Sequence, residues 1–156
     1  MKIVCMLFLI VVLPLTGWAS EGNPYGVSVE ELVERGMAED DGIYMSLAAK
    51  RCAAFIDLVN GVLQRDTGKA PFDGQVDTFL AVSMSIETIK AKERGAGDDS
   101  INGIGERVFE DYARHRENYL AWMTYNYDYY GDYWGTDPKM AAELQYCKTL
   151  IEVFEG

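Results

Sequence analysis

Two cysteines are the residues whose chemistry the sequence defines best. Of the three cysteines in the chain, Cys5 lies in an apolar N-terminal run, whereas Cys52 and Cys147 each fall on the apolar stripe of an expected helix. In an oxidising compartment an even pair of cysteines usually forms a structural disulfide. We therefore predict a Cys52–Cys147 bridge that ties the first long helix to the last, worth up to about 4.5 kcal/mol in the chain-entropy model.

An incomplete calcium motif follows the middle of the chain. Asp98, Ser100 and Asn102 precede Gly103, which matches oxygen donors at the first, third and fifth positions of a calcium loop and glycine at the sixth. The last position, where a bidentate glutamate is expected, is Phe109. The three donors are thus a partial candidate for Ca²⁺, and the alternative is a polar linker in which Asp99 or Ser100 caps a helix.

Known catalytic arrangements do not occur in this sequence. His115 is the single histidine, and both cysteines of the expected mature chain are assigned to the bridge. No serine lies in a Gly-x-Ser-x-Gly elbow, and no His/Glu spacing typical of zinc is present. We therefore predict that the protein is not an enzyme. A small hydrolase that uses unidentified carboxylates is an alternative, because acidic residues are plentiful.

An aromatic segment at 125–134 is the most unusual part of the sequence. Its aromatic residues are Tyr125, Tyr127, Tyr129, Tyr130, Tyr133 and Trp134. Tyrosine and tryptophan are favoured at protein interfaces because they are rigid and amphipathic. We predict that these residues bind a partner. The alternatives are a loop that packs its rings over the end of the fold and a small-ligand site.

The elements that position these residues are helices. Apolar residues recur at intervals of three and four from 41 to about 65, from about 73 to 94, from 100–105 to about 125, and from 137 onwards. Ser28 and Glu31 form a capping-box pattern that opens a shorter helix. The expected caps of the later helices include Asp40 or Asp41, Asp73, and Asp137 followed by proline. No stretch alternates as a strand does. The expected fold is all-α: a small antiparallel bundle of four main helices plus a short N-terminal helix, stapled by one disulfide.

The first nineteen residues have the features of a cleaved signal peptide. Lys2 precedes an apolar run from 3 to 13, and Gly17 and Ala19 are the small residues that a cleavage site requires. The run would reach roughly 16 Å as a helix, short of the ~30 Å hydrocarbon core. We predict a signal peptide at 1–19, an irregular lead-in at 20–27 and a single helical domain at 28–156. The mature protein would be periplasmic or secreted, without a stable membrane span.

Charge restricts the partners. The chain has 14 basic and 25 acidic residues and a formal net charge of −11. Such a surface repels nucleic acid and attracts a basic protein or a cation. We predict an exported, non-enzymatic helical protein that binds another protein, for example an inhibitor, an immunity-type protein or an envelope assembly factor. The alternative is a small-ligand or calcium-binding module that uses the loop at 98–103 or at 125–134.

Overall fold

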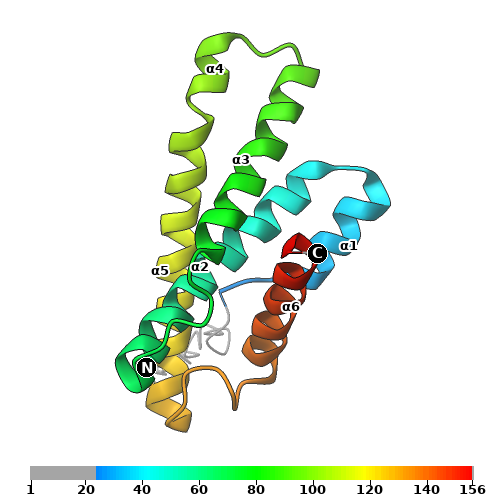
Figure 1. Ribbon diagram of the computed structural model, residues 1–156. Coiled ribbons are helices and arrows are strands. Elements are labelled where there is room, and N and C mark those ends of the chain that lie inside the picture. The colour runs from blue at the N-terminus through cyan, green and yellow to red at the C-terminus, as the bar shows by residue number, and fades with distance from the viewer. Residues whose placement is uncertain (1–23, 156) are drawn as a thin grey trace, which may run out of the picture.

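The computed structural model describes residues 24–155, and within them it contains helices and no strand (Figure 1). The helices are α1 (Val29–Glu39), α2 (Gly42–Thr67), α3 (Gln75–Glu93), α4 (Asp98–Asn102), α5 (Ile104–Tyr130) and α6 (Pro138–Glu155). The predicted all-α fold is confirmed. The predicted signal peptide lies outside the described residues. None of the helices in the described range is both long and apolar enough to cross a membrane.

Helix α2 is the centre of the molecule. It packs against α1, α3, α5 and α6. Helices α3 and α5 run side by side and are joined through α4 at one end, while α1 folds back along α2 and also contacts α6 (Figure 1). Helix α1 therefore packs against both α2 and α6.

Small side chains explain why α2 can be central. Ala48, Ala49, Ala53 and Ala54 are all buried, so neighbouring helices approach α2 closely from several directions. A helix that is apolar on more than one face belongs inside the structure. The core has two parts along α2. One surrounds Cys52, Cys147 and Phe79, and the other surrounds Phe55 and Trp122.

Several predicted helix ends are confirmed. Ser28 and Glu31 form the capping box of α1, with both of its hydrogen bonds present. Asp41 caps α2 by accepting from the Ile43 amide at 3.0 Å. Asp137 caps α6 by accepting from the amides of the second and third helical residues, as expected for a cap followed by proline.

Helix α2 ends close to the expected position near 65. It continues through Asn60 and Gly61 to Thr67, and the Asn60 side chain accepts from the Phe72 amide at 3.0 Å. The expected caps of two other helices are not formed. Helix α3 begins after Gly74 without a side-chain cap, so Asp73 does not serve as one. Helix α4 likewise begins after Gly97, and neither Asp99 nor Ser100 caps it.

The largest correction concerns α5. We expected this helix to end near Tyr125, but it continues to Tyr130. Gly131 ends it with a positive φ of 73° and donates its amide to the Tyr127 carbonyl at 2.9 Å. Glycine adopts this left-handed conformation without the steric cost that other residues incur. The aromatic segment is therefore half helix and half loop.

Candidate functional site

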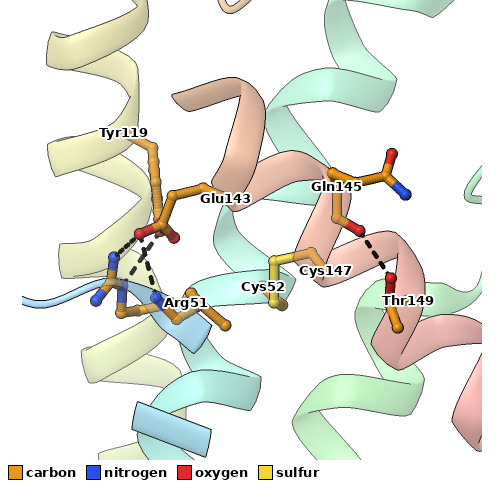
Figure 2. Close-up of a disulfide and its surroundings, with 8 residues drawn as sticks. Arg51, Cys52, Tyr119, Glu143, Gln145, Cys147 and Thr149 are labelled. Carbon is orange, nitrogen blue, oxygen red and sulfur yellow. Dashed lines mark hydrogen bonds and ion pairs between the residues drawn. A yellow bond between two sulfur atoms is a disulfide. The ribbon is translucent and has the colours of Figure 1, made fainter. Parts of the chain in front are cut away.

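The predicted disulfide is confirmed. Cys52 of α2 and Cys147 of α6 are bonded, with both side chains buried and their Cα atoms 5.4 Å apart (Figure 2). The bridge closes a sequence separation of 95. It joins α6 to the central helix at a point where both helices face the core.

A buried ion pair lies beside the disulfide, and sequence analysis missed it. Arg51 immediately precedes Cys52, and Glu143 lies one helical turn before Cys147. Nη2 of Arg51 is 2.6 Å from Oε1 of Glu143, and these two residues are 2% and 4% exposed (Figure 2). A position four residues from a buried cysteine on one helix shares its face. That spacing is the signal by which Glu143 could have been found.

Hydrogen bonds from two other helices complete the pair. The Tyr119 hydroxyl of α5 donates to Oε2 of Glu143 at 2.8 Å and accepts from Nε of Arg51 at 3.2 Å. The Val29 amide at the start of α1 donates to Oε1 of Glu143 at 3.2 Å. Both carboxylate oxygens of Glu143 are thus engaged, an arrangement that fixes α1, α2, α5 and α6 relative to one another.

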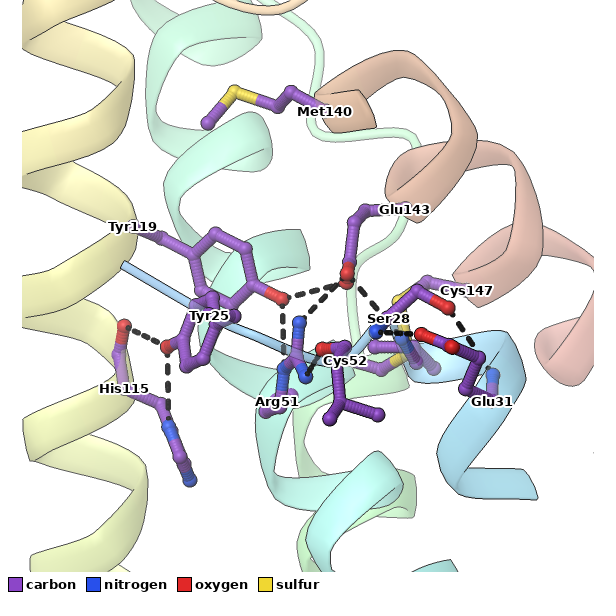
Figure 3. A network of polar contacts seen from close by, with 12 residues as sticks. Tyr25, Ser28, Glu31, Arg51, Cys52, His115, Tyr119, Met140, Glu143 and Cys147 are labelled. Carbon is purple, nitrogen blue, oxygen red and sulfur yellow. Dashed lines mark hydrogen bonds and ion pairs between the residues drawn. A yellow bond between two sulfur atoms is a disulfide. The ribbon is translucent and has the colours of Figure 1, made fainter. Parts of the chain in front are cut away.

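Arg51 also holds the lead-in to α1 in place (Figure 3). Its Nη1 donates to the Val27 carbonyl at 2.6 Å, and its guanidinium lies 3.8 Å from the centroid of the Tyr25 ring. The Tyr25 hydroxyl lies 3.1 Å from Nδ1 of His115 and donates to the His115 carbonyl oxygen at 3.3 Å. The segment before α1 is therefore tied to both α2 and α5.

Burial sets the protonation of this network. Desolvation raises the pKa of Glu143, with the Arg51 charge acting in the opposite direction. Burial raises the pKa of Tyr25 to about 12. The pKa of His115 is lowered to about 4, first by burial and then by the positive charge of Arg51. His115 is therefore neutral at physiological pH and accepts or donates as a neutral ring.

The low pKa of His115 predicts an acid-dependent loss of stability. The unfolded chain takes up a proton near pH 6.5 and the folded chain near pH 4, so stability is highest above pH 6.5 and falls as the pH drops towards 4. Allowing for partial exposure, we expect a loss of about 1–2 kcal/mol from this group. His115→Gln keeps an acceptor but does not titrate. Urea unfolding across this range should show a flatter dependence for the variant, and parallel curves would contradict the assignment.

A second buried cation, on α2, links this helix to α3 and α5. Lys50, 6% exposed, lies 2.8 Å from Oε1 of Glu87 on α3 and 2.7 Å from Oδ2 of Asp111 on α5. Asp111 also pairs with Arg114 at 2.7 Å. Asp111 therefore pairs with both a buried lysine and an exposed arginine.

The candidate calcium residues lie on α4. Asp98, Ser100 and Asn102 are the first, third and fifth residues of this five-residue helix. Residues two apart on a helix point to different faces, so the helix does not bring Ser100 together with the other two. Among residues 24–155 no three acidic, histidine or cysteine side chains gather as metal ligands. Calcium binding at this loop stays a prediction.

The aromatic segment is divided between core and surface. Tyr133 and Trp134, in the loop after α5, are partly buried against the part of the core around Phe55 and Trp122. Tyr127, Tyr129 and Tyr130, on the last turns of α5, are 50%, 70% and 57% exposed. We call these three residues the tyrosine surface. The packing alternative therefore describes the loop half of the segment, and the helical half stays accessible.

Neighbouring rings, from the loop and from α5 itself, contact the tyrosine surface. The rings of Tyr127 and Tyr133 are stacked, with centroids 4.6 Å apart and an interplanar angle of 19°. The Tyr133 hydroxyl accepts from Nη2 of Arg65 on α2 at 3.2 Å. Tyr125 lies 4.3 Å from Tyr129, centroid to centroid. These contacts restrict the motion of the rings.

A small cavity of about 170 Å³ adjoins this surface, between the end of α5 and the start of α6. Its lining consists of Tyr125, Asn126, Tyr130, Thr136, Asp137, Pro138 and Lys139. We call it the α5–α6 cavity. A separate cavity of about 390 Å³ lies between the lead-in to α1 and helix α6, with Glu143 among its lining residues.

Fold and contacts together define a class: an all-helical bundle with a buried disulfide and an internal ion pair that fix its last helix. Comparison of the chain with protein-family models, curated proteins and solved structures finds no match. The interpretation of function therefore depends on the side chains themselves.

Proposed function

We propose that the protein is an exported binding protein whose tyrosine surface contacts another protein. The observation that carries this proposal is the exposure of Tyr127, Tyr129 and Tyr130 within four residues at the end of a long helix. Tyrosine supplies a large contact area with few rotatable bonds, and buried tyrosines are frequent energetic centres of interfaces. An inhibitor, an immunity-type protein or an envelope assembly factor would use such a surface.

The ring contacts made by the tyrosine surface favour binding. Because Tyr127 stacks on Tyr133 and Tyr125 contacts Tyr129, the rings lose less conformational freedom when they meet a partner. A helix end is also a more rigid platform than the loop that we expected from sequence. The geometry thus supports recognition by a preorganised surface, whose side chains are already ordered before binding.

The disulfide supports export. A bridge between two buried cysteines persists in an oxidising compartment and is rare in the cytosol. The predicted signal peptide and the acidic net charge agree with a periplasmic or secreted protein that meets a basic partner.

Alanine substitution of the exposed tyrosines tests the proposal. We expect Tyr129→Ala with Tyr130→Ala to abolish capture of a partner from a native extract of the exported compartment, because truncating interface tyrosines removes contact area at its centre. Quantitative mass spectrometry of the captured proteins is the measurement. Helical circular dichroism should not change, because both side chains are exposed.

A matched control uses an exposed aromatic residue elsewhere on the same helix. Phe109 is 53% exposed and lies near the opposite end of α5. Phe109→Ala should capture the same partner as the wild-type protein. If the double tyrosine variant captures it equally well, the tyrosine surface is not the binding site.

A further inference from the structure

We propose that the α5–α6 cavity receives an arginine side chain of the partner, next to the tyrosine surface. This inference rests on the proposed function and names the chemistry that the surface recognises. The cavity measures about 170 Å³. An engineered protein cavity of about 150 Å³ holds a benzene molecule, so this volume accommodates a guanidinium with adjoining methylene groups.

Aromatic rings form one side of the cavity. Tyr125 and Tyr130 line it from the last turns of α5, and Tyr129 lies beside both, at centroid distances of 4.3 Å and 6.5 Å. The face of a tyrosine ring attracts a cation electrostatically. Guanidinium is planar and stacks on such rings, which an ammonium does not do.

Asn126 provides an unused acceptor at the same place. Its side chain is buried, 1% exposed, and its Nδ2 donates to Oδ2 of Asp137 at 3.2 Å and to the Tyr133 carbonyl at 3.3 Å. These two acceptors set the orientation of the amide. Oδ1 then has no hydrogen-bond donor. A buried acceptor without a donor is unfavourable, and a ligand that carries N–H groups would relieve it.

The charges that face the cavity favour a cation. Asp137 lines it, whereas Asp132 is not a lining residue and contacts one, since it accepts from the Thr136 amide at 2.9 Å. Lys139 is the single cation among the lining residues, and it is exposed, so its ammonium can remain in water. The lining thus carries one carboxylate and one solvated lysine, and the formal net charge of −11 on the whole chain attracts a cation to it.

The molecule already pairs arginine with tyrosine in two places. The Arg51 guanidinium lies 3.8 Å from the Tyr25 ring centroid, and that of Arg65 lies 5.6 Å from the Tyr133 ring centroid. Arg65 also donates to the Tyr133 hydroxyl at 3.2 Å. A partner arginine in the α5–α6 cavity would repeat the combination of ring contact and hydrogen bond.

Nuclear magnetic resonance titration with N-acetyl-arginine amide tests this inference without the natural partner. The indole N–H of Trp122 donates to Oδ2 of Asp137 at 2.7 Å and so reports on the cavity. We expect a saturable shift of this resonance. N-acetyl-citrulline amide has the same shape without the charge and should produce no saturable shift.

Two variants locate the binding. Tyr130→Leu should weaken the arginine compound by about threefold, because it removes one ring face. Phe109→Leu should leave the affinity unchanged. A titration in which arginine and citrulline compounds behave alike, or in which Tyr130→Leu has no effect, would overturn the inference. The broader proposal would still stand if the double tyrosine variant lost its partner, so the two failures are distinguishable.

Discussion

Arg51→Met is expected to lower the free energy of unfolding by about 3–5 kcal/mol, the cost of removing one partner of a buried ion pair. Glu143 would keep its burial but lose the positive charge 2.6 Å away. The substitution also removes the donor to the Val27 carbonyl and the cation over Tyr25. Equilibrium urea unfolding, followed by helical circular dichroism, measures the change.

A second arginine provides the matched control. Arg114 pairs with Asp111 at the same close range, 2.7 Å, but its side chain is 67% exposed. Exposed ion pairs contribute little, so Arg114→Met should leave the midpoint nearly unchanged. If Arg51→Met were equally mild, the buried pair would not be holding α6 and the lead-in as described.

Combining Arg51→Met with Glu143→Leu separates charge from packing. Replacing both members of a buried pair by apolar residues is often neutral or stabilising, because no uncompensated charge remains. We expect the double variant to recover much of the stability that Arg51→Met loses. A double variant that is less stable than either single variant would show that the hydrogen bonds of Tyr119 and Val29 matter more than the charge.

Removal of the disulfide is the second large effect that we expect. Cys52→Ala with Cys147→Ala should destabilise the fold by about 2–4.5 kcal/mol, because the bridge restricts a separation of 95 residues in the unfolded chain. Urea unfolding of the wild-type protein with and without reductant measures the same contribution. Reductant should not affect the double variant, which serves as the control.

Hydrogen exchange shows where that loss appears. Helix α6 is attached to the rest of the molecule chiefly through α1 and α2, and the bridge joins it to α2. Amides of α6 should therefore exchange faster in the double variant, while those of α3 and α5 change less. An unchanged midpoint under reductant, or two thiols that alkylate without it, would contradict the account.

The sequence predicted what depends on local pattern. Spacing at three and four identified the helices, and the position of Cys52 and Cys147 on apolar stripes identified the bridge. Capping at Ser28, Asp41 and Asp137 was also local, because each of these caps accepts a hydrogen bond from an amide within three residues.

What the sequence did not predict depends on contacts between distant residues. Arg51 and Glu143 are 92 residues apart, and nothing near either one shows that the other will neutralise it. Lys50 is a similar case, since its partners come from two other helices. A charged residue in an apolar helix can be solvated or paired, and tertiary packing decides which.

The aromatic segment depends both on local helix preference and on contacts between distant residues. Tyrosine is a moderate helix former, so its intrinsic preference did not decide where α5 ends. Stacking of Tyr127 on Tyr133 and the left-handed Gly131 settle the end at Tyr130. Packing against the core around Phe55 and Trp122 then decides which of the six rings stay accessible. This packing involves several helices, so it cannot be predicted from one stretch of sequence.

Site-specific photo-crosslinking tests the central claim, that the tyrosine surface meets a protein, most directly. Benzoylphenylalanine replaces Tyr129, which is 70% exposed, in the protein expressed in its native host, and in a second preparation it replaces Phe109. We predict a crosslinked protein adduct from position 129 that is absent from position 109. No adduct at position 129, or the same adducts from both positions, would contradict the account.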